Sequence, residues 1–142
     1  MILVEDLMTR EVVTLNPGDD LALADTILRL GRIRHLPVTD ANQKLVGLIT
    51  HRDLLRVFAD VGRAQGKQVL ARDVMNTDLV TVTPKMALGN ALSTMVHNKF
   101  GCLPVVDPAG KLVGLITEAD LVKFAARFAR DFDALEKHAQ GK

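Results

Sequence analysis

The sequence predicts an α+β fold in which helices lie on small sheets and one unit is present twice. The main observation is an internal repeat: Leu45–Thr50 reads Leu-Val-Gly-Leu-Ile-Thr and returns unchanged as Leu112–Thr117, 67 residues later. In addition, each copy has the same order of apolar runs and helical stripes: strand, helix, strand, strand and helix. A unit of about 67 residues is only marginally stable alone, because it buries a small share of its surface, so the two units should share one core.

The same offset of 67 residues relates further motifs, with no insertion between the copies. Self-similarity at one spacing is typical of supersecondary units that bury their apolar faces against each other. The matching pairs are Asp6 and Asp73, Met8 and Met75, Val13-Thr14 and Val80-Thr81, Pro17 and Pro84, Leu36–Val38 and Leu103–Val105, Asp40 and Asp107, Asp53 and Asp120, and Leu54 and Leu121.

Each copy is expected to open with an edge strand. Val12–Leu15 in the first copy and Leu79–Val82 in the second are short runs rich in apolar and β-branched residues. Each run ends two residues before a proline, Pro17 or Pro84. Because proline cannot donate to a strand ladder, it favours a turn at this point.

A helix should follow, because apolar residues then recur at spacings of three and four. These residues are Leu21, Ala24, Ile27, Leu28 and Gly31 in the first copy, and Leu88, Ala91, Leu92, Met95 and Val96 in the second. Leu36–Thr39 predicts the next strand and Leu45–Thr50 a buried third strand, with a turn at Asp40–Asn42 between them. A last helix should start after Thr50, and its counterpart after Thr117.

This order divides the chain into three parts. Residues 1–66 hold the first repeat with a linker, residues 67–126 the second repeat, and residues 127–142 a terminal helical extension. The stretch Val57–Leu70 contains two glycines and several polar residues, which indicates the tail of a helix followed by the linker.

Composition limits the classes of function. The formal net charge is +1 with no basic tail, whereas proteins that bind the nucleic-acid backbone normally show a basic excess. No apolar run approaches the roughly 18 residues of a membrane span, and Met1–Asp6 lacks the basic start of a signal peptide. The single cysteine, Cys102, excludes an internal disulfide framework. We therefore expect a cytoplasmic protein that binds neither membrane nor nucleic acid.

The corner between the third strand and the last helix is the strongest candidate for a binding site. The hydroxyl of Thr50 or Thr117 and the first free N–H groups of the helix could hold an anion at the positive end of the dipole. Asp53 or Asp120, three residues later, could accept hydrogen bonds from the vicinal diol of a ribose, so the corner suggests a nucleotide. The alternative is a capping box, which satisfies the helix's own N–H groups and needs no ligand.

These residues and their order resemble the CBS domain family, whose members occur as tandem pairs called Bateman modules. The resemblance spans Val4 to Lys123. It rests on Asp-x-Met, the Val-Thr strand before a proline, Leu-Pro-Val-x-Asp and Gly-x-Ile-Thr-x-x-Asp, each of which is present twice. Each motif is weak alone, but the set in this order is quite specific.

The resemblance implies two βαββα repeats that are related by a pseudo-twofold axis and packed sheet against sheet, with helices outside. It also implies two clefts for adenosyl ligands, namely AMP, ADP, ATP or S-adenosylmethionine, which act as regulatory ligands and not as cofactors. In the family, the Thr and Asp of the corner contact phosphate and ribose, and contributions to a cleft cross the axis. The ligand-binding residues carried over are Thr50, Asp53, Thr117 and Asp120, with adenine contacts from Asn16, Thr83, Ile33, Arg34, His35, Phe100, Gly101 and Cys102.

The two clefts are expected to differ in charge. His51 and Arg52 precede Asp53, and Arg34 with a histidine precedes the first Leu-Pro-Val, whereas the second copy has no basic residue at these positions. We therefore expect the cleft of Asp53 to prefer phosphorylated ligands, and the cleft of Asp120 to take AMP weakly or a less anionic ligand. The alternative is that Arg34 and Arg52 are solvated surface charges.

No constellation of residues predicts catalysis or a metal site. None of the four histidines has a clear partner at the spacing of a helical metal site. Cys102 has no positioned base and should pack as a small apolar residue. An enzyme is therefore not expected.

A stripe of large apolar residues continues along the terminal helix. Its members are Leu121, Phe124, Phe128, Phe132 and Leu135. The first copy ends near Phe58 without such a stripe, so the core of the repeat is complete without it. Burial of each aromatic ring could contribute about 1.5–3 kcal/mol, so we expect a homodimer formed through helices.

Two classes of function remain. The leading one is a regulatory module that senses an adenosyl ligand and alters its conformation or its binding of an enzyme or transporter. The alternative is an interaction or scaffold module with vestigial clefts. A ligand that stabilises the fold would favour the first class.

Overall fold

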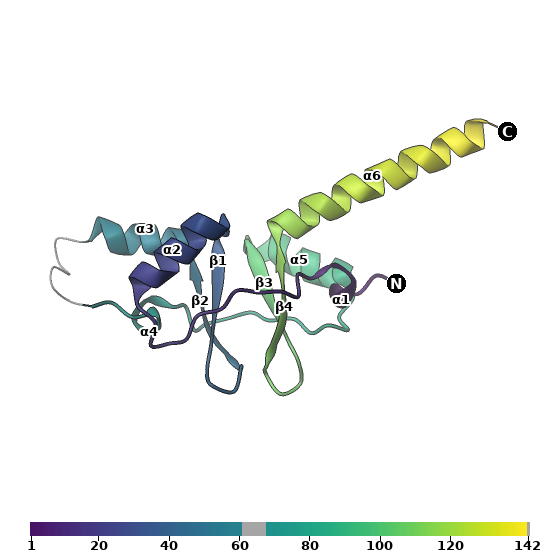
Figure 1. The fold of residues 1–142 in the computed structure, drawn as a ribbon. Helices are drawn as coiled ribbons and strands as arrows, with labels where there is room; N and C mark the ends of the chain where they lie inside the picture. The colour runs from purple at the N-terminus through teal and green to yellow at the C-terminus, as the bar shows by residue number, and fades with distance from the viewer. Residues whose placement is uncertain (61–67, 142) are drawn as a thin grey trace.

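The two copies of the repeat form two matching units that lie side by side, each with a two-stranded sheet and helices on its outer side (Figure 1). This computed structural model describes residues 1–60 and 68–141. Residues 61–67, inside the predicted linker, lie outside the described part. The elements in chain order are α1 (Val4–Leu7), α2 (Leu21–Gly31), β1 (His35–Thr39), β2 (Leu45–Thr50), α3 (His51–Ala59), α4 (Ala71–Val74), α5 (Leu88–Asn98), β3 (Cys102–Val106), β4 (Leu112–Thr117) and α6 (Glu118–Gln140).

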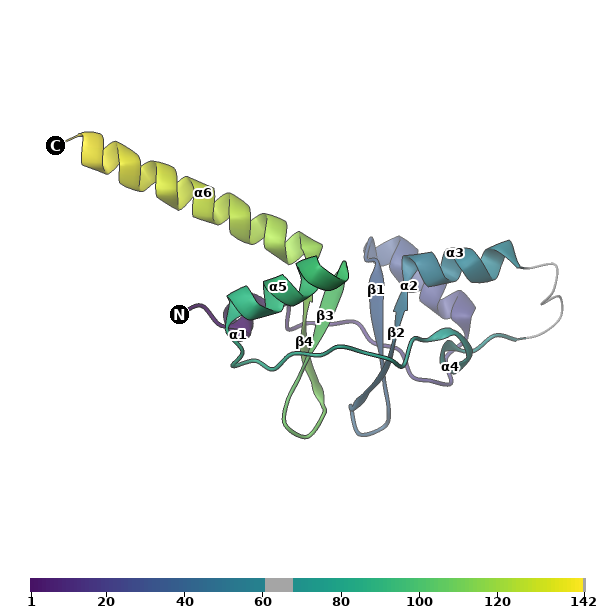
Figure 2. The same ribbon diagram turned by 180° about the vertical axis from the view of Figure 1, so that it is seen from behind.

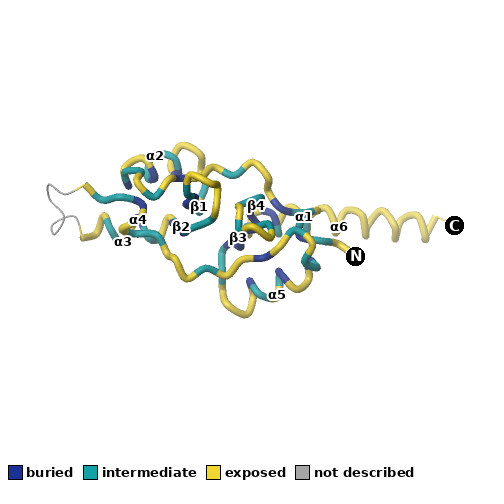
Figure 3. The backbone as a smooth tube through the Cα atoms, turned by 90° about the horizontal axis from the view of Figure 1, so that it is seen from below, coloured by how far each residue is buried: buried dark blue, intermediate teal, exposed yellow. Residues whose placement is uncertain are grey.

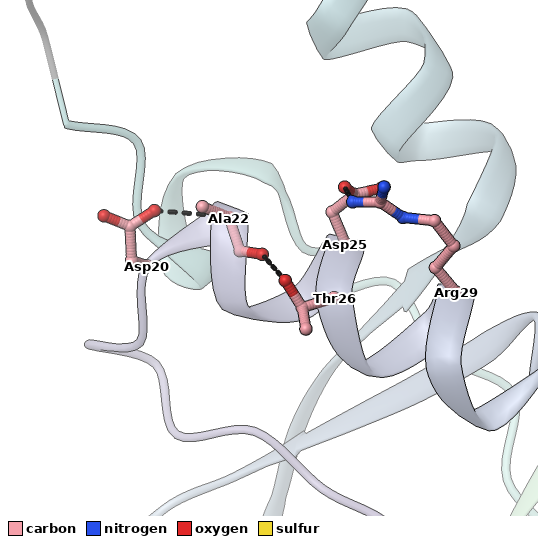
Figure 4. Close-up of polar contacts among 5 residues, drawn as sticks. All are labelled: Asp20, Ala22, Asp25, Thr26 and Arg29. Carbon is pink, nitrogen blue, oxygen red and sulfur yellow. Dashed lines mark hydrogen bonds and ion pairs between the residues drawn. The ribbon is translucent and has the colours of Figure 1, made fainter.

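Helix α2 is capped at its N-terminus and ends at a residue in the left-handed conformation. The Asp20 carboxylate accepts a hydrogen bond of 2.8 Å from the Ala22 amide and so satisfies a free N–H group of the first turn (Figure 4). Asp25 and Arg29 form an ion pair along the exposed side of the helix (Figure 4). The helix ends where Arg32 adopts a left-handed conformation with φ of 51°.

Helix α5 is the counterpart of α2 in the second repeat. The predicted helical stripes are confirmed, because Leu21, Ala24 and Leu28 of α2 and Leu88, Ala91 and Met95 of α5 are all buried. Gly31 and Val96, also predicted to face the core, are exposed, Val96 to 72%. The N-cap residue of α5 is Ala87, which has no side chain that could accept a hydrogen bond.

The two hairpins have the same register. His35 pairs with Thr50 across β1 and β2, and Cys102 pairs with Thr117 across β3 and β4. Both hairpins also shift register at the same place, one residue before the end of the first strand. The duplicated sequence therefore folds into duplicated backbone.

The predicted opening strands are wrong in length, because each is reduced to a single bridging residue. Leu15 forms a parallel bridge with Val38, and Val82 forms one with Val105. The Leu15 amide donates to the Pro37 carbonyl and its carbonyl accepts from Thr39, but the residues before it run along the surface. The ladder cannot extend to the residues before the bridge, because Pro37 and Pro104 on the partner strands have no N–H group to donate.

The opening segments of the repeats are exchanged between the two cores. Val4 and Met8 are buried in the core of the second repeat, whereas Ala71 is buried in the core of the first and Met75 packs against it. Figures 1 and 2 accordingly show α1 beside α5 and α4 near α2 and α3. The predicted single shared core is therefore wrong: each repeat has its own core, which is completed by the opening segment of the other repeat.

Two glycines make this exchange possible. A Cβ on Gly47 would lie 2.4 Å from the sulfur of Met75, and a Cβ on Gly114 would lie 2.6 Å from the sulfur of Met8. Each distance is far below van der Waals contact. The repeated glycine is therefore required because a methionine of the other repeat fills the place of its side chain.

Backbone hydrogen bonds also join the two hairpins directly. Leu45 donates to the Gly110 carbonyl and Leu112 donates to the Gln43 carbonyl, each at 3.1 Å. The predicted fold class is confirmed: two α+β repeats with their sheets inside and their helices outside (Figure 1).

Helix α6 leaves this body at an angle. From Ala125 to Gln140 every residue is exposed, and Figure 3 shows the helix projecting beyond the second repeat. None of the described helices combines the length and the apolar character needed to cross a bilayer.

Candidate functional site

The two corners singled out in the sequence have the same local geometry. Thr50 is the N-cap of α3, and its amide and hydroxyl donate to one oxygen of Asp53 at 2.8 and 2.9 Å. The Asp53 amide in turn donates to the Thr50 hydroxyl at 3.3 Å. The same reciprocal bonds link Thr117 and Asp120 at the start of α6. The capping interpretation is therefore confirmed at both corners.

The Asp120 corner has an additional bond from the other repeat. The hydroxyl of Thr9 donates to the second oxygen of Asp120 at 2.9 Å, and Asp120 is buried. The backbone of Thr9 is fixed by two hydrogen bonds with Leu115 of β4. The exchanged opening segment therefore brings a threonine of the first repeat to the corner of the second.

A cavity of about 480 Å³ opens beside this corner, and we call it the Asp120 cavity. Its walls come from both repeats and from four stretches of the chain. They are Thr9 with Glu11–Val13, Arg32–His35, Leu115, and Thr117–Asp120 with Val122 and Lys123. Its size lies within the range of about 300–1,000 Å³ that is usual for small-molecule sites.

The structure brings a part of the predicted site residues together in this cavity. Ile33, Arg34 and His35 of the first repeat line the same cavity as Thr117 and Asp120 of the second. A contribution that crosses between the repeats, as the family resemblance implied, is therefore present in the geometry.

Arg34 and His35, which were expected to add charge to the cleft of Asp53, line the Asp120 cavity, and the expected ligand preference of the Asp53 cleft stays a prediction. The Arg34 carbonyl accepts a hydrogen bond of 2.9 Å from the His51 amide, so the backbone of Arg34 lies near the Asp53 corner. Both residues nevertheless line the Asp120 cavity, because they precede or begin β1 at the boundary with the second repeat. The backbone of Arg34 thus lies near one corner, while both residues line the cavity at the other.

The Asp120 cavity combines charged and apolar walls. Arg32, Arg34 and Lys123 supply cationic groups, while Glu11 and Glu118 supply anionic ones. Apolar surface comes from Val12, Val13, Ile33 and Val122. Such a lining suits a ligand with a flat apolar part and an anionic part.

His35 lies where the two repeats meet. A Cβ on Gly101 would be 3.0 Å from its ring, so the imidazole occupies the place of a side chain at that position. Burial lowers the pKa of His35, partly opposed by the carboxylate of Glu118 and more weakly by Asp53. Its Nδ1 is buried and has no hydrogen-bond partner in the described structure.

The remaining predicted residues lie apart from the Asp120 cavity. Phe100 packs against the core of the second repeat, and Cys102 is buried, which raises the pKa of its thiol to about 12. Arg52 is exposed on the first turn of α3. Asn16 and Thr83 form the turns before α2 and α5, outside the cavity lining.

Several residues of the cavity were not predicted. Thr9 follows the Asp-x-Met motif directly and Glu11 comes two residues later, but nothing in the repeat places either of them beside the second copy. Val122 and Lys123 lie four residues after Glu118 and Ala119, so the helical spacing could have indicated them. In the described residues, no three His, Cys, Asp or Glu side chains are grouped so as to hold a metal ion.

Comparison with known proteins agrees with this architecture. The profile of the CBS domain matches residues 4–60 and 71–127. The crystal structure of AcuB from Vibrio cholerae has a TM-score of 0.84 at 37% identity, over 94% of this chain and 97% of that one. CBSX2 in complex with AMP has a TM-score of 0.82 at 28% identity, over 91% and 99% of the chains. The CBS domain pair of MJ0100, in complex with 5'-methylthioadenosine and S-adenosyl-L-methionine, has a TM-score of 0.78 at 26% identity, over 89% and 97%.

Among curated relatives, the inosine-5'-monophosphate dehydrogenase of Mycobacterium tuberculosis is 40% identical over 116 residues. The match covers 82% of this chain but 21% of that enzyme. The corresponding enzyme of Methanocaldococcus jannaschii is 33% identical, with 84% of this chain and 23% of the enzyme covered. The chain therefore spans less than a quarter of these relatives, and it belongs to the CBS domain family as a tandem pair.

Proposed function

We propose that this chain is a regulatory module that binds an adenosyl nucleotide between its two repeats and changes conformation or partner binding as a result. AMP, ADP, ATP and S-adenosylmethionine are the candidate ligands. The observation that carries the proposal is the Asp120 cavity, which has walls from both repeats. A ligand that touches both repeats can shift their relative arrangement by its differential affinity for two states.

The chemistry of the cavity supports a phosphorylated ligand. Thr117 is the N-cap of α6, where free N–H groups and the helix dipole favour an anion. Arg34 and Lys123 line the same space and could pair with a phosphate. Asp120 would bind a ribose diol after its hydrogen bond with Thr9 is exchanged for one with the sugar.

Apolar residues on the other side of the cavity would hold the base. Val12, Ile33 and Val122 offer flat contacts, and His35 can stack on an adenine or donate to it. CBSX2 was crystallised with AMP, and the MJ0100 pair with two other adenosyl compounds, which supports an adenosyl ligand here.

The Asp53 corner would form the second cleft. Thr50 and Asp53 repeat the geometry of the Asp120 corner, and Arg52 lies on the first turn of the same helix. Phe100, Gly101 and Cys102 are the counterparts of Ile33, Arg34 and His35 at an offset of 67 residues. Asn16 and Thr83 remain candidates for adenine contacts from the turns before α2 and α5.

The proposed module acts in the cytoplasm as a homodimer that associates through its helices and regulates an enzyme or transporter. Several large apolar residues on helices are exposed, among them Leu30 of α2 at 81%, Leu55 of α3 at 56% and Val96 of α5 at 72%. Apolar groups of this size on helical surfaces favour association with another protein.

The alternative is an interaction or scaffold module whose clefts bind nothing. It is favoured by the capping boxes, because both aspartates already satisfy helix N–H groups and need no ligand to explain them. Ligand binding separates the two functions directly.

Isothermal titration calorimetry with AMP, ATP, S-adenosylmethionine and adenosine tests the proposal. We expect Arg34→Gln to weaken AMP binding at least about 10-fold and adenosine binding little, because a charge-assisted hydrogen bond to phosphate is lost. Arg29→Gln, on the exposed side of α2, is the matched control and should bind AMP normally.

Thermal unfolding gives an independent measure, because a ligand at 100 times its Kd stabilises the folded state by about 2.7 kcal/mol. Asp120→Ala and Asp53→Ala then assign the two clefts. If none of the four compounds gives a heat of binding or a thermal shift, the ligand-sensing function is excluded and the scaffold function is supported.

A further inference from the structure

The outer half of α6 has an apolar face that no described residue covers. Phe128 is 62% exposed, Phe132 52% and Leu135 69%. A helix of 23 residues that projects into water gains little from its own hydrogen bonds, and amphipathic helices are normally stabilised by packing of the apolar face. Figure 3 shows how far this segment extends from the core.

The spacing of the apolar residues along α6 alternates between four and three. The exposed positions are Ala125, Phe128, Phe132, Leu135 and Ala139, whereas Leu121 at the base of the stripe packs against the core of the second repeat. This is the a and d pattern of a two-stranded coiled coil. Lys123, Arg130 and Lys137 recur every seven residues on the opposite face, where they would remain in solvent. The stripe therefore fits one further helix of the same kind.

We infer that the apolar stripe of α6 pairs with the α6 stripe of a second copy of this chain in antiparallel orientation. Phe128 of each copy lies opposite Phe132 of the other at the centre of the seam. The inference names the surface and orientation of the proposed homodimer and rests on that part of the proposed function alone. It does not depend on ligand binding.

Charge along the helix argues for the antiparallel orientation. The first turn of α6 is acidic, with Glu118 and Asp120, and the last turn is basic, with Lys137 and His138. Antiparallel pairing places the acidic turn of one copy beside the basic turn of the other. Parallel pairing would place acidic turns together and basic turns together, and would also align the helix dipoles unfavourably.

Side-chain size gives an independent argument. In the antiparallel register, Ala125 of each copy lies opposite Leu135 of the other, so these two layers combine a large with a small residue. Parallel pairing would place Ala125 against itself and both phenylalanine layers against themselves. Even filling of the seam therefore also favours the antiparallel arrangement.

This arrangement brings the second copy to the edge of the Asp120 cavity. Val122 lines the cavity, and in this register it lies level with His138 of the second copy. Glu118, which also lines the cavity, lies about one turn beyond His138. Dimerisation and occupation of the cavity would consequently influence each other.

Sedimentation velocity of the full chain tests the surface. We expect a dimer at micromolar concentration. Phe128→Glu should weaken association at least about 100-fold, because it places a charge on both helices of the seam. Arg130→Glu, two residues away on the solvent face, is the matched control and should stay dimeric. Circular dichroism checks that the variants are folded.

A wild-type monomer at 100 µM, or a Phe128→Glu variant that remains a dimer, would overturn the inference. Orientation is tested in a Cys102→Ala background by mixing Ala125→Cys protein with Leu135→Cys protein. Antiparallel pairing predicts a mixed disulfide between the two proteins, whereas a disulfide of Ala125→Cys with itself would indicate parallel helices and overturn the orientation. AMP calorimetry on the same samples reports separately on the proposed ligand, so either proposal can fail without the other.

Discussion

The two corners of the molecule share a motif and a backbone but differ in surroundings. At the first corner, the second oxygen of Asp53 lies 4.0 Å from the guanidinium of Arg56, and the carboxylate is half-buried. At the second, the same oxygen of Asp120 accepts the hydroxyl of Thr9, and the carboxylate is buried. A duplicated motif thus fixes the geometry of the cap and not the environment of the cap.

The difference originates in residues outside the motif. The hairpin registers are the same, yet the residue opposite Thr50 is His35 and the residue opposite Thr117 is Cys102. Likewise, Arg34 in the first repeat corresponds to a glycine in the second, and the His35 ring fills the space beside that glycine. Two like units therefore provide unlike sites. The following four predictions compare residues with their counterparts in the other repeat.

The largest effect is expected at the glycine–methionine contacts. Gly47→Val should destabilise the fold by about 3 kcal/mol, because its Cβ would overlap the side chain of Met75 at 2.4 Å. Gly114→Val should have a similar effect through Met8. Urea unfolding measures both, and Gly18→Ala, with no atom near its Cβ, serves as the control. If Met75→Ala does not restore part of the stability lost in Gly47→Val, the contact is not the cause.

The second effect distinguishes the two aspartates. Thr9→Val removes the hydroxyl donor to a buried carboxylate and should cost about 2 kcal/mol of stability. Its counterpart, Asn76→Val, should cost less, since Asn76 donates no side-chain hydrogen bond to Asp53 in the described structure. Equal losses in chemical denaturation would mean that the corners do not differ in the way described.

The third effect concerns the helix caps. Asp20 caps α2, whereas Ala87 at the equivalent position of α5 forms no side-chain cap. We expect Asp20→Ala to lose about 1 kcal/mol and Ala87→Asp to gain about the same amount. Thermal unfolding of the two variants and of their combination would show whether the caps act independently.

The smallest effect is a dependence of stability on pH. Because burial lowers the pKa of His35 in the folded state, the unfolded state binds more protons just below the ordinary value of 6.5. The free energy of unfolding should therefore fall as the pH drops through 6.5 and recover as it rises. His35→Gln should reduce this slope in urea unfolding measured between pH 5 and 8. Cys102, at the equivalent position, titrates far outside this range because burial raises its pKa to about 12.

Much of the fold could be predicted because the local signals agree with the final structure. The helical stripes, the hairpins and the caps after Thr50 and Thr117 all follow from short-range spacing. The weaker opening strands were overestimated, because their β-branched residues lie along the surface and a single residue forms each bridge.

The exchange of opening segments could not be predicted from the repeat. Both copies carry the same methionine and the same glycine, so the pattern is satisfied whether Met8 packs on Gly47 or on Gly114. The same ambiguity concealed the position of Thr9 beside the corner of the second repeat. Because the two copies have the same residues at these positions, the sequence does not show which copy supplies each contact.

The exchange also has a consequence for protein synthesis. Val4 and Met8 leave the ribosome about 110 residues before Ile116, which belongs to the same core. Synthesis adds about 5–20 residues per second, so this segment is exposed to chaperones and proteases for several seconds before the residues that bury it emerge. The first repeat is likewise incomplete until Ala71 has emerged. The core of the first repeat can therefore close earlier in synthesis than the core of the second, which needs both Val4 and Ile116.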